Sequence, residues 1–233
     1  MAKTGLSMKK TSIILAFLLT AAVLSAQNSF VRNGSNGSGI TANIANGDDG
    51  FSEITGSTAF SIGGVLDLGL KFGNIDKTRF DEEATDTEFG LIYNILPIQY
   101  NIYMFDLLAA VRGSYEYIIV ESDYIDQITG TMEGQGFSIA LEGMVDFSPV
   151  EFVTVRAGYH IGHTSHIFTV EGDDAGTPVD ITARERNNEK GFLAGVWVDY
   201  PGIPIVGYEA LFLDSDNFGE YIKHRISIVL KSD

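Results

Sequence analysis

The residues best suited to acid–base chemistry lie in one short segment, Tyr159 to His166, which holds three of the four histidines in the chain. His163 and Ser165 are two positions apart, so on a β-strand they share a face. A histidine beside a serine can activate the hydroxyl as a nucleophile when an acid orients the ring. Polar side chains at a water-exposed rim give the same pattern, and we favour that interpretation. The chain is predicted not to be an enzyme, and no catalytic residue is assigned.

A second group of charged side chains alternates with apolar ones, which places it on the opposite face of the same predicted strands. Both signs are interspersed, so these residues are expected to neutralise one another as a structural network of ion pairs. A metal ion would need three or four ligands converging at about 2 Å, and no spacing here indicates that. No metal and no cofactor are therefore predicted. The expected network consists of Lys71, Glu88, Arg112, Glu116, Glu142, Arg156, His160, Glu209 and Arg225.

Acidic residues dominate the chain, whose formal net charge is −16. The segment from Asp76 to Glu88 is the most acidic, yet it lacks the ordered ligand spacing of a calcium loop, so we interpret it as solvated surface. A strongly acidic exterior repels nucleic acid, which is excluded as a partner. The chain has no cysteine, so disulfides, thiolate metal sites and a lipid-modified export signal are excluded as well.

The elements that must position these residues are β-strands. In residues 65–72 and 136–147 large apolar side chains occupy every second position, while polar residues and glycines lie opposite. The same alternation recurs along most of the chain and predicts strands that face lipid on one side and a polar interior on the other. The predicted strands are 39–46, 51–62, 65–75, 87–96, 106–120, 132–147, 152–170, 183–200, 203–214 and 218–231.

The connections between these strands alternate between tight and long. Tight turns are predicted at 63–64, 148–151 and 201–202, and long polar loops at 76–86, 121–131 and 171–182. Such alternation is typical of outer-membrane barrels, with short turns in the periplasm and long loops outside. The apolar stretch 97–105 falls where a short turn belongs and is expected to extend its two neighbouring strands. Because 39–46 is short and polar, eight strands remain open as an alternative to ten.

An export signal precedes the strands. Met8, Lys9 and Lys10 are followed by an apolar stretch, Ile13 to Leu24, too short for a membrane-spanning helix, and then by Ser25 and Ala26. We predict a signal peptide at 1–26, with room for an upstream start at Met1, a flexible lead-in at 27–38 and a barrel at 39–233. A retained membrane anchor is the alternative for the first segment. A soluble β-sandwich is the alternative for the remainder.

The chain resembles the small outer-membrane β-barrel proteins of the OmpA, OmpX and OmpW kind, and the resemblance covers the region after residue 26. It implies an all-β, closed, antiparallel, up-and-down transmembrane barrel of eight to ten strands, with ten favoured. It also implies a Gram-negative-type outer membrane, with membrane lipid and the barrel-insertion machinery as partners. The chain departs from these proteins at its end, Leu230-Lys231-Ser232-Asp233, where they carry an aromatic residue. His163 and Ser165 separately resemble the histidine and serine of outer-membrane lipid A deacylases.

Three functions follow from this architecture. A barrel of this size has an interior about wide enough for its own side chains, so the charged network is expected to plug it. We therefore expect a structural or surface-interaction role, with the acidic loops contacting an extracellular ligand or a host surface. A narrow, porin-like channel for small or apolar solutes is the second hypothesis. A lipid-modifying hydrolase is a distant third.

Overall fold

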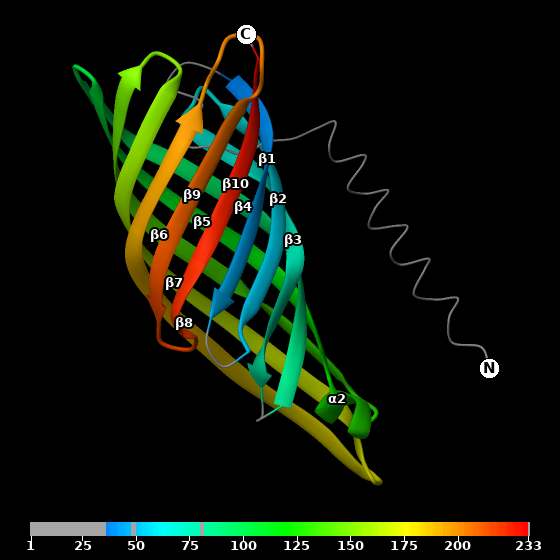
Figure 1. The fold of residues 1–233 in the computed structure, drawn as a ribbon. Helices are drawn as coiled ribbons and strands as arrows, with labels where there is room; N and C mark the ends of the chain where they lie inside the picture. The colour runs from blue at the N-terminus through cyan, green and yellow to red at the C-terminus, as the bar shows by residue number, and fades with distance from the viewer. Residues whose placement is uncertain (1–35, 48–49, 80–81, 233) are drawn as a thin grey trace.

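Ten antiparallel strands close into a single barrel within the residues that the computed structural model describes, 36–47, 50–79 and 82–232. Each strand pairs with its neighbours in sequence, and β1 pairs with β10 to complete the circle (Figure 1). The predicted signal peptide, 1–26, lies outside the described residues. The strands are β1 (Asn36–Gly47), β2 (Ser52–Ile62), β3 (Leu66–Arg79), β4 (Glu82–Ile102), β5 (Phe105–Ser122), β6 (Thr131–Val150), β7 (Val153–Asp174), β8 (Thr177–Val198), β9 (Ile205–Ser215) and β10 (Gly219–Ser232).

Strand β1 decides between ten strands and eight. It pairs with β10 from Asn36 opposite Ser232 to Gly47 opposite Tyr221, and with β2 on its other side. The hydroxyls of Thr41 and Ser227 share a 2.9 Å hydrogen bond across the β1–β10 seam. Ten strands are therefore confirmed. The strand begins at Asn36, so the last three residues of the predicted lead-in, 36–38, belong to it.

Backbone geometry explains the connection between β2 and β3 and the path of the chain from β4 to β5. Gly63 and Gly64 join β2 to β3 with φ values of 61° and 65°, the left-handed pair that a two-residue hairpin turn requires. The apolar stretch 97–105 does extend β4 and β5, as predicted, with a bulge between Ile95 and Ile98. Pro97 lies inside that bulge, where its missing N–H leaves no gap in the hydrogen-bond ladder.

The prediction of three long polar loops was wrong. Residues 76–86 and 171–182 mostly continue the strands of two long hairpins, and 121–131 holds only a short helix, α2 (Asp123–Gln127). The physical reason is a small apolar core on the inner face of these extensions, which stabilises the strands beyond the closed part of the barrel. It comprises Ala84, Ile118, Val120, Ile125, Ile128, Met132, Phe168 and Val170.

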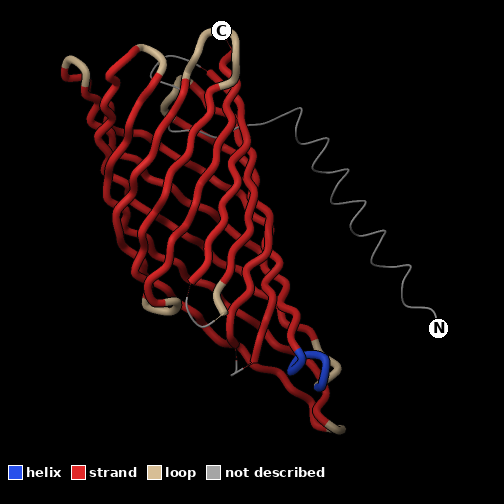
Figure 2. The backbone as a smooth tube through the Cα atoms, in the orientation of Figure 1, coloured by secondary structure: helices blue, strands red, loops and turns tan. Residues whose placement is uncertain are grey.

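The two ends of the barrel differ in shape. Strand β1 begins and β10 ends at the rim that carries the tight turns (Figure 2). At the other rim the β5–β6 and β7–β8 hairpins extend furthest, with α2 beside them, so that rim is slanted (Figure 1). The pattern of short and long connections assigns the first rim to the periplasm and the second to the cell exterior.

The outer wall is apolar and the inner wall is mixed, as the alternation predicts. Leu68, Leu91, Leu141 and Ile161 are half exposed on the outside. Aromatic pairs lie near the periplasmic rim, where Phe105 stacks on Phe147 and Phe152 meets Tyr200 edge to face. Among the described residues, no helix is long and apolar enough to cross a membrane.

Candidate functional site

All nine side chains of the predicted charge network point into the barrel. Glu88, Glu116, Glu142, Arg156, His160 and Glu209 are buried, while Lys71, Arg112 and Arg225 are partly buried. They separate into two groups along the barrel. We call the group nearer the periplasm the arginine cluster: Asp146, Arg156, Trp197, Glu209, Arg225, Glu142, Arg112 and His160. The group nearer the cell exterior is the lysine cluster: Lys71, Glu88, Ser114, Glu116, Ser138 and His166.

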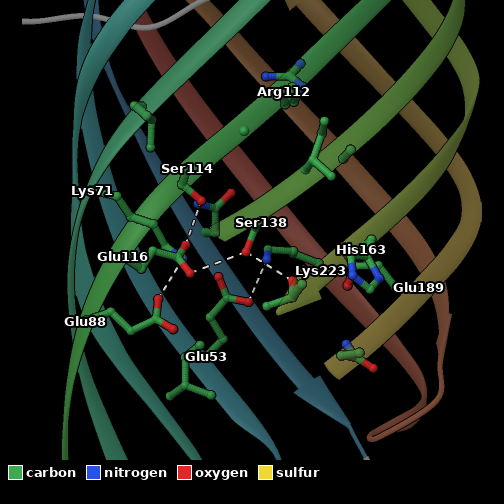
Figure 3. A pocket seen from close by; sticks show the side chains of 18 of the residues that line it. Glu53, Lys71, Glu88, Arg112, Ser114, Glu116, Ser138, His163, Glu189 and Lys223 are labelled. Carbon is green, nitrogen blue, oxygen red and sulfur yellow. Dashed lines mark hydrogen bonds and ion pairs between the residues drawn. The ribbon is translucent and has the colours of Figure 1, made fainter. Parts of the chain in front are cut away.

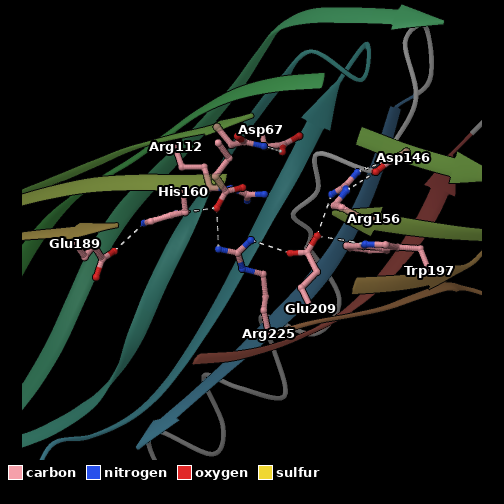
Figure 4. Close-up of polar contacts among 11 residues, drawn as sticks. Asp67, Arg112, Asp146, Arg156, His160, Glu189, Trp197, Glu209 and Arg225 are labelled. Atoms are coloured by element: carbon pink, nitrogen blue, oxygen red, sulfur yellow. Dashed lines mark hydrogen bonds and ion pairs between the residues drawn. The ribbon is translucent and has the colours of Figure 1, made fainter. Parts of the chain in front are cut away.

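Arg225 is the centre of the arginine cluster (Figure 4). Its Nη1 donates to Glu209 Oε2 at 2.8 Å, and its Nη2 lies 3.2 Å from Glu142 Oε1. Arg225 lies on β10 and Glu142 on β6. Three strands, β7 to β9, separate them in one direction around the barrel, and five strands, β1 to β5, separate them in the other. One guanidinium therefore reaches across the lumen and joins opposite walls.

Arg156 closes the periplasmic side of the same cluster. Its Nε and Nη2 donate to the two carboxylate oxygens of Asp146 at 2.7 and 2.8 Å, and Nη1 donates to Glu209 at 3.0 Å. The guanidinium also lies 5.6 Å from the centre of the Trp197 ring, whose Nε1 donates to Glu209 at 3.3 Å. A bidentate contact of this kind fixes both the orientation and the distance of the guanidinium, so Arg156 forms a rigid floor, the periplasmic end of the arginine cluster.

Glu142 gathers the remaining members of the arginine cluster. Arg112 Nε donates to Glu142 Oε2 at 2.6 Å, and His160 Nδ1 lies 3.2 Å from Glu142 Oε1. His160 Nε2 in turn contacts Glu189 at 2.9 Å, and Glu189 accepts from the hydroxyl of Tyr221 at 2.5 Å. The network thus runs without interruption from the periplasmic floor toward the cell exterior.

The lysine cluster surrounds a cavity above this floor (Figure 3). Lys71 Nζ lies 2.6 Å from Glu88 and 2.8 Å from Glu116, and His166 Nε2 contacts the other oxygen of Glu116 at 2.8 Å. The cavity has a volume of about 220 Å³ and is lined by members of both clusters, with Arg225 among them. Its lining carries carboxylates and cations together, so its polar groups satisfy one another.

A second crossing of the lumen was not among the predicted contacts. Lys77 Nζ on β3 contacts Asp86 at 2.9 Å and reaches Glu185 on β8 at 3.1 Å. Strands β3 and β8 lie on opposite sides of the ten-strand order. These residues fell in or beside segments predicted to be loops, and recognising the strand alternation there would have placed Lys77 and Glu185 on inward positions.

The histidine and serine considered for catalysis are separated from this network. His163 and Ser165 pair with Ile139 and Phe137, which face outward, so both lie on the lipid side of β7. Among the described residues, His163 Nδ1 bonds to the side-chain oxygen of Asn188 at 2.7 Å rather than to Ser165. The ring is thus held by an amide, and the serine is not coupled to it.

The described residues also give no support for a metal site. Across 36–47, 50–79 and 82–232, no group of histidines and carboxylates is arranged to hold a metal ion. The charged side chains instead lie in contact with side chains of opposite sign. The arrangement has a structural consequence: its ion pairs link the walls of the barrel and fill its interior.

Comparisons with known proteins identify the architecture. No protein-family model and no curated protein sequence matches the chain. Among solved structures, the chain is similar to the translocator domain of the autotransporter NalP from Neisseria meningitidis, with a TM-score of 0.51 and 9% identity over 97% of this chain and 96% of that one. It is also similar to Ail, the attachment invasion locus protein of Yersinia pestis, with a TM-score of 0.41 and 10% identity over 85% and 100%.

The outer membrane protease OmpT from Escherichia coli matches with a TM-score of 0.40 and 9% identity, over 85% of this chain and 92% of that one. At such identities the similarity shows the fold alone. Together with the closed topology and the apolar outer wall, the similarity to the NalP domain defines the class: this chain has the fold of a small bacterial outer-membrane β-barrel.

Proposed function

We propose that this protein is a closed outer-membrane barrel that does not conduct solutes and that presents its long hairpins as an interaction surface outside the cell. The main support for a closed lumen is the bridge from Arg225 to Glu142 and Glu209, because it joins opposite walls within the membrane. The contact between Lys77 and Glu185 joins opposite walls again near the cell exterior. A solute on its way through would have to separate both sets of charges.

Single-channel recording in planar bilayers tests the closed lumen. We expect the refolded wild-type protein to be silent and Arg225→Ser to give discrete conductance steps, because serine cannot reach either carboxylate. The matched control is Lys231→Ser, which removes a cation from an exposed pair with Asp199. Folding of each variant is checked by heat-modifiable migration on a gel. Steady conductance in the wild type would refute a closed lumen.

The cavity supports a second candidate function, a narrow channel. It has a volume of about 220 Å³ and is partly open, and Lys77 and Arg225 both line it, so a rearrangement of either side chain would widen a passage through the lumen. Wild-type conductance that Arg225→Ser enlarges would favour this channel over the closed barrel. A lipid hydrolase is not proposed, since His163 is held by Asn188.

The interaction surface rests on the slanted outer rim, where the β7–β8 hairpin extends beyond its neighbours (Figure 1). Its tip, Ala175 and Gly176, is exposed and is a suitable place for an epitope tag. We expect an antibody to label this tag on intact cells, whereas a tag in the periplasmic turn at Gly63 and Gly64 should require permeabilised cells. Labelling in the reverse pattern would overturn the assigned orientation and the surface role.

A further inference from the structure

The outer half of β8 has a free edge. Strand β8 pairs with β7 along its whole length, from Thr177 to Val198, but with β9 only from Glu189 onward. The β9–β10 turn ends the pairing there, and the rest of β8 continues past the rim with β7 on one side and no strand on the other (Figures 1 and 2). Nearly all residues from 177 to 186 are exposed. An open strand edge presents unpaired backbone donors and acceptors to another strand.

The hydrogen bonds at the β9–β10 turn show which backbone groups face this edge. The carbonyl of Asn188 accepts from the N–H of Asp216 at 3.0 Å, and that of Arg186 accepts from the side chain of Asn217 at 3.0 Å. In a strand, alternate residues direct both backbone groups to the same edge. The even-numbered residues of β8 therefore face the free edge.

Three residues supply the available groups: Asp180, Thr182 and Arg184. Within the described part of the chain, no strand pairs with them on this side. The stretch is bounded at one end by Pro178, which has no N–H to donate, and at the other by Arg186, whose carbonyl Asn217 already occupies. The open edge is thus a short segment with defined limits.

This segment is complementary to itself. When two copies are placed antiparallel with Thr182 opposite Thr182, Asp180 of each copy lies opposite Arg184 of the other. All three pairs would exchange both backbone hydrogen bonds, and the two opposite-charge pairs would add to them. On the inner face, Ile181 is 48% exposed and would be covered by Ala183 of the second copy.

Other registers lose this match. Centring the pair on Asp180 opposes two aspartates, and centring it on Arg184 opposes two arginines, both of which are unfavourable. Centring the pair on Ile181 sets Arg184 against Pro178, and centring it on Ala183 sets Asp180 against Arg186, whose carbonyl is occupied. Charge and hydrogen bonding therefore select the register centred on Thr182.

We propose that the free edge of β8 pairs with the same edge of a second copy held in a facing membrane. The orientation follows from symmetry. A two-fold axis that joins two antiparallel edges into one continuous sheet stands perpendicular to that sheet. Because the barrel wall runs along the barrel axis, this two-fold axis lies parallel to the membrane and reverses the direction of the second barrel. The proposal names the partner of the surface role above and rests on it.

Clustering of protein-bearing lipid vesicles tests this pairing, with light scattering as the readout. We expect wild-type vesicles to cluster, and Asp180→Arg or Arg184→Asp to reduce clustering about tenfold or more, since each variant turns both attractive pairs into repulsive ones. The matched control is Lys190→Asp, which makes the same charge change on β8 where β9 already covers the edge. All variants are first shown to be folded by heat-modifiable migration.

The double variant Asp180→Arg/Arg184→Asp gives the decisive result. It restores opposite charges between identical copies but opposes like charges when it meets the wild type. In a mixture of two vesicle populations with different dyes, we expect each population to cluster with itself and not with the other. Mixed clusters, or wild-type vesicles that stay apart, would overturn the pairing. If tag labelling on intact cells still succeeds, only the second copy is refuted as the partner and the surface role stands.

Discussion

Replacing Arg225 with glutamine should destabilise the folded barrel by about 3 kcal/mol, the lower end of the range for breaking a buried ion pair. Arg225 contacts Glu142 and Glu209, whose side chains are 0% and 1% exposed. Each carboxylate keeps a second arginine, Arg112 for Glu142 and Arg156 for Glu209. In Arg225→Gln neither carboxylate is left wholly unpaired, so we expect a loss of stability at the lower end of the range for breaking a buried ion pair.

Urea unfolding of the refolded protein in detergent micelles measures this change. The chain has one tryptophan, Trp197, which contacts Glu209 and so reports on the arginine cluster by its fluorescence. The control, Lys231→Gln, breaks a pair whose side chains are 43% and 38% exposed, and it should cost less than about 1 kcal/mol.

A double-mutant cycle separates the contact from general effects. Glu142→Gln combined with Arg225→Gln should destabilise the barrel by about 1 to 3 kcal/mol less than the sum of the two single changes. Each single change leaves the partner's buried charge without this contact, and the second change removes that charge. Strict additivity, or an Arg225→Gln variant as stable as Lys231→Gln, would refute the argument that this side chain holds opposite walls together.

Two further predictions concern the walls of the barrel. Leu141→Arg places a charge on the lipid face, where the leucine is 54% exposed, and should destabilise the barrel by about 2 to 4 kcal/mol, whereas Ala140→Ser on the adjacent inward position should be nearly neutral in the same unfolding assay. Gly69→Ala would bring its Cβ within 2.0 Å of the carbonyl oxygen of Thr58 and should cost about 1 to 3 kcal/mol, while Gly143→Ala meets nothing within 4 Å and should stabilise its strand by up to about 1 kcal/mol. Equal tolerance of Leu141→Arg and Ala140→Ser would contradict the assigned faces, and equal tolerance of Gly69→Ala and Gly143→Ala would contradict the close approach of Thr58 to Gly69.

The sequence contains most of the information about the walls and little about the contacts across the lumen. Alternation of apolar and polar residues assigns Glu142 and Arg225 to inward positions, because side chains on a strand alternate strictly between two faces. It does not say that they meet. Their contact depends on the registers of all the intervening strands, each set by pairing and turn geometry rather than by local composition.

The extensions beyond the rim show a different limit. Segments 76–86 and 171–182 are polar and rich in turn-forming residues, which favours a loop when they are considered alone. The strands persist because Ala84 and Val179 of these segments pack against an inner-face core that includes Ile118 and Phe168. These residues are far apart in the sequence, so only the folded structure reveals their shared core.

The β1–β10 seam also sets the order of events when the chain folds. Its hydrogen bond from Thr41 to Ser227 joins residues 186 positions apart, so the ladder is completed only after the last strand has been delivered. Contacts of such long range make folding slow, because the entropy of closing a long loop is lost before the seam can form. Until then β1 and β10 both have open edges, which are prone to aggregation. A chain truncated before Gly219 should consequently form aggregates rather than a smaller barrel.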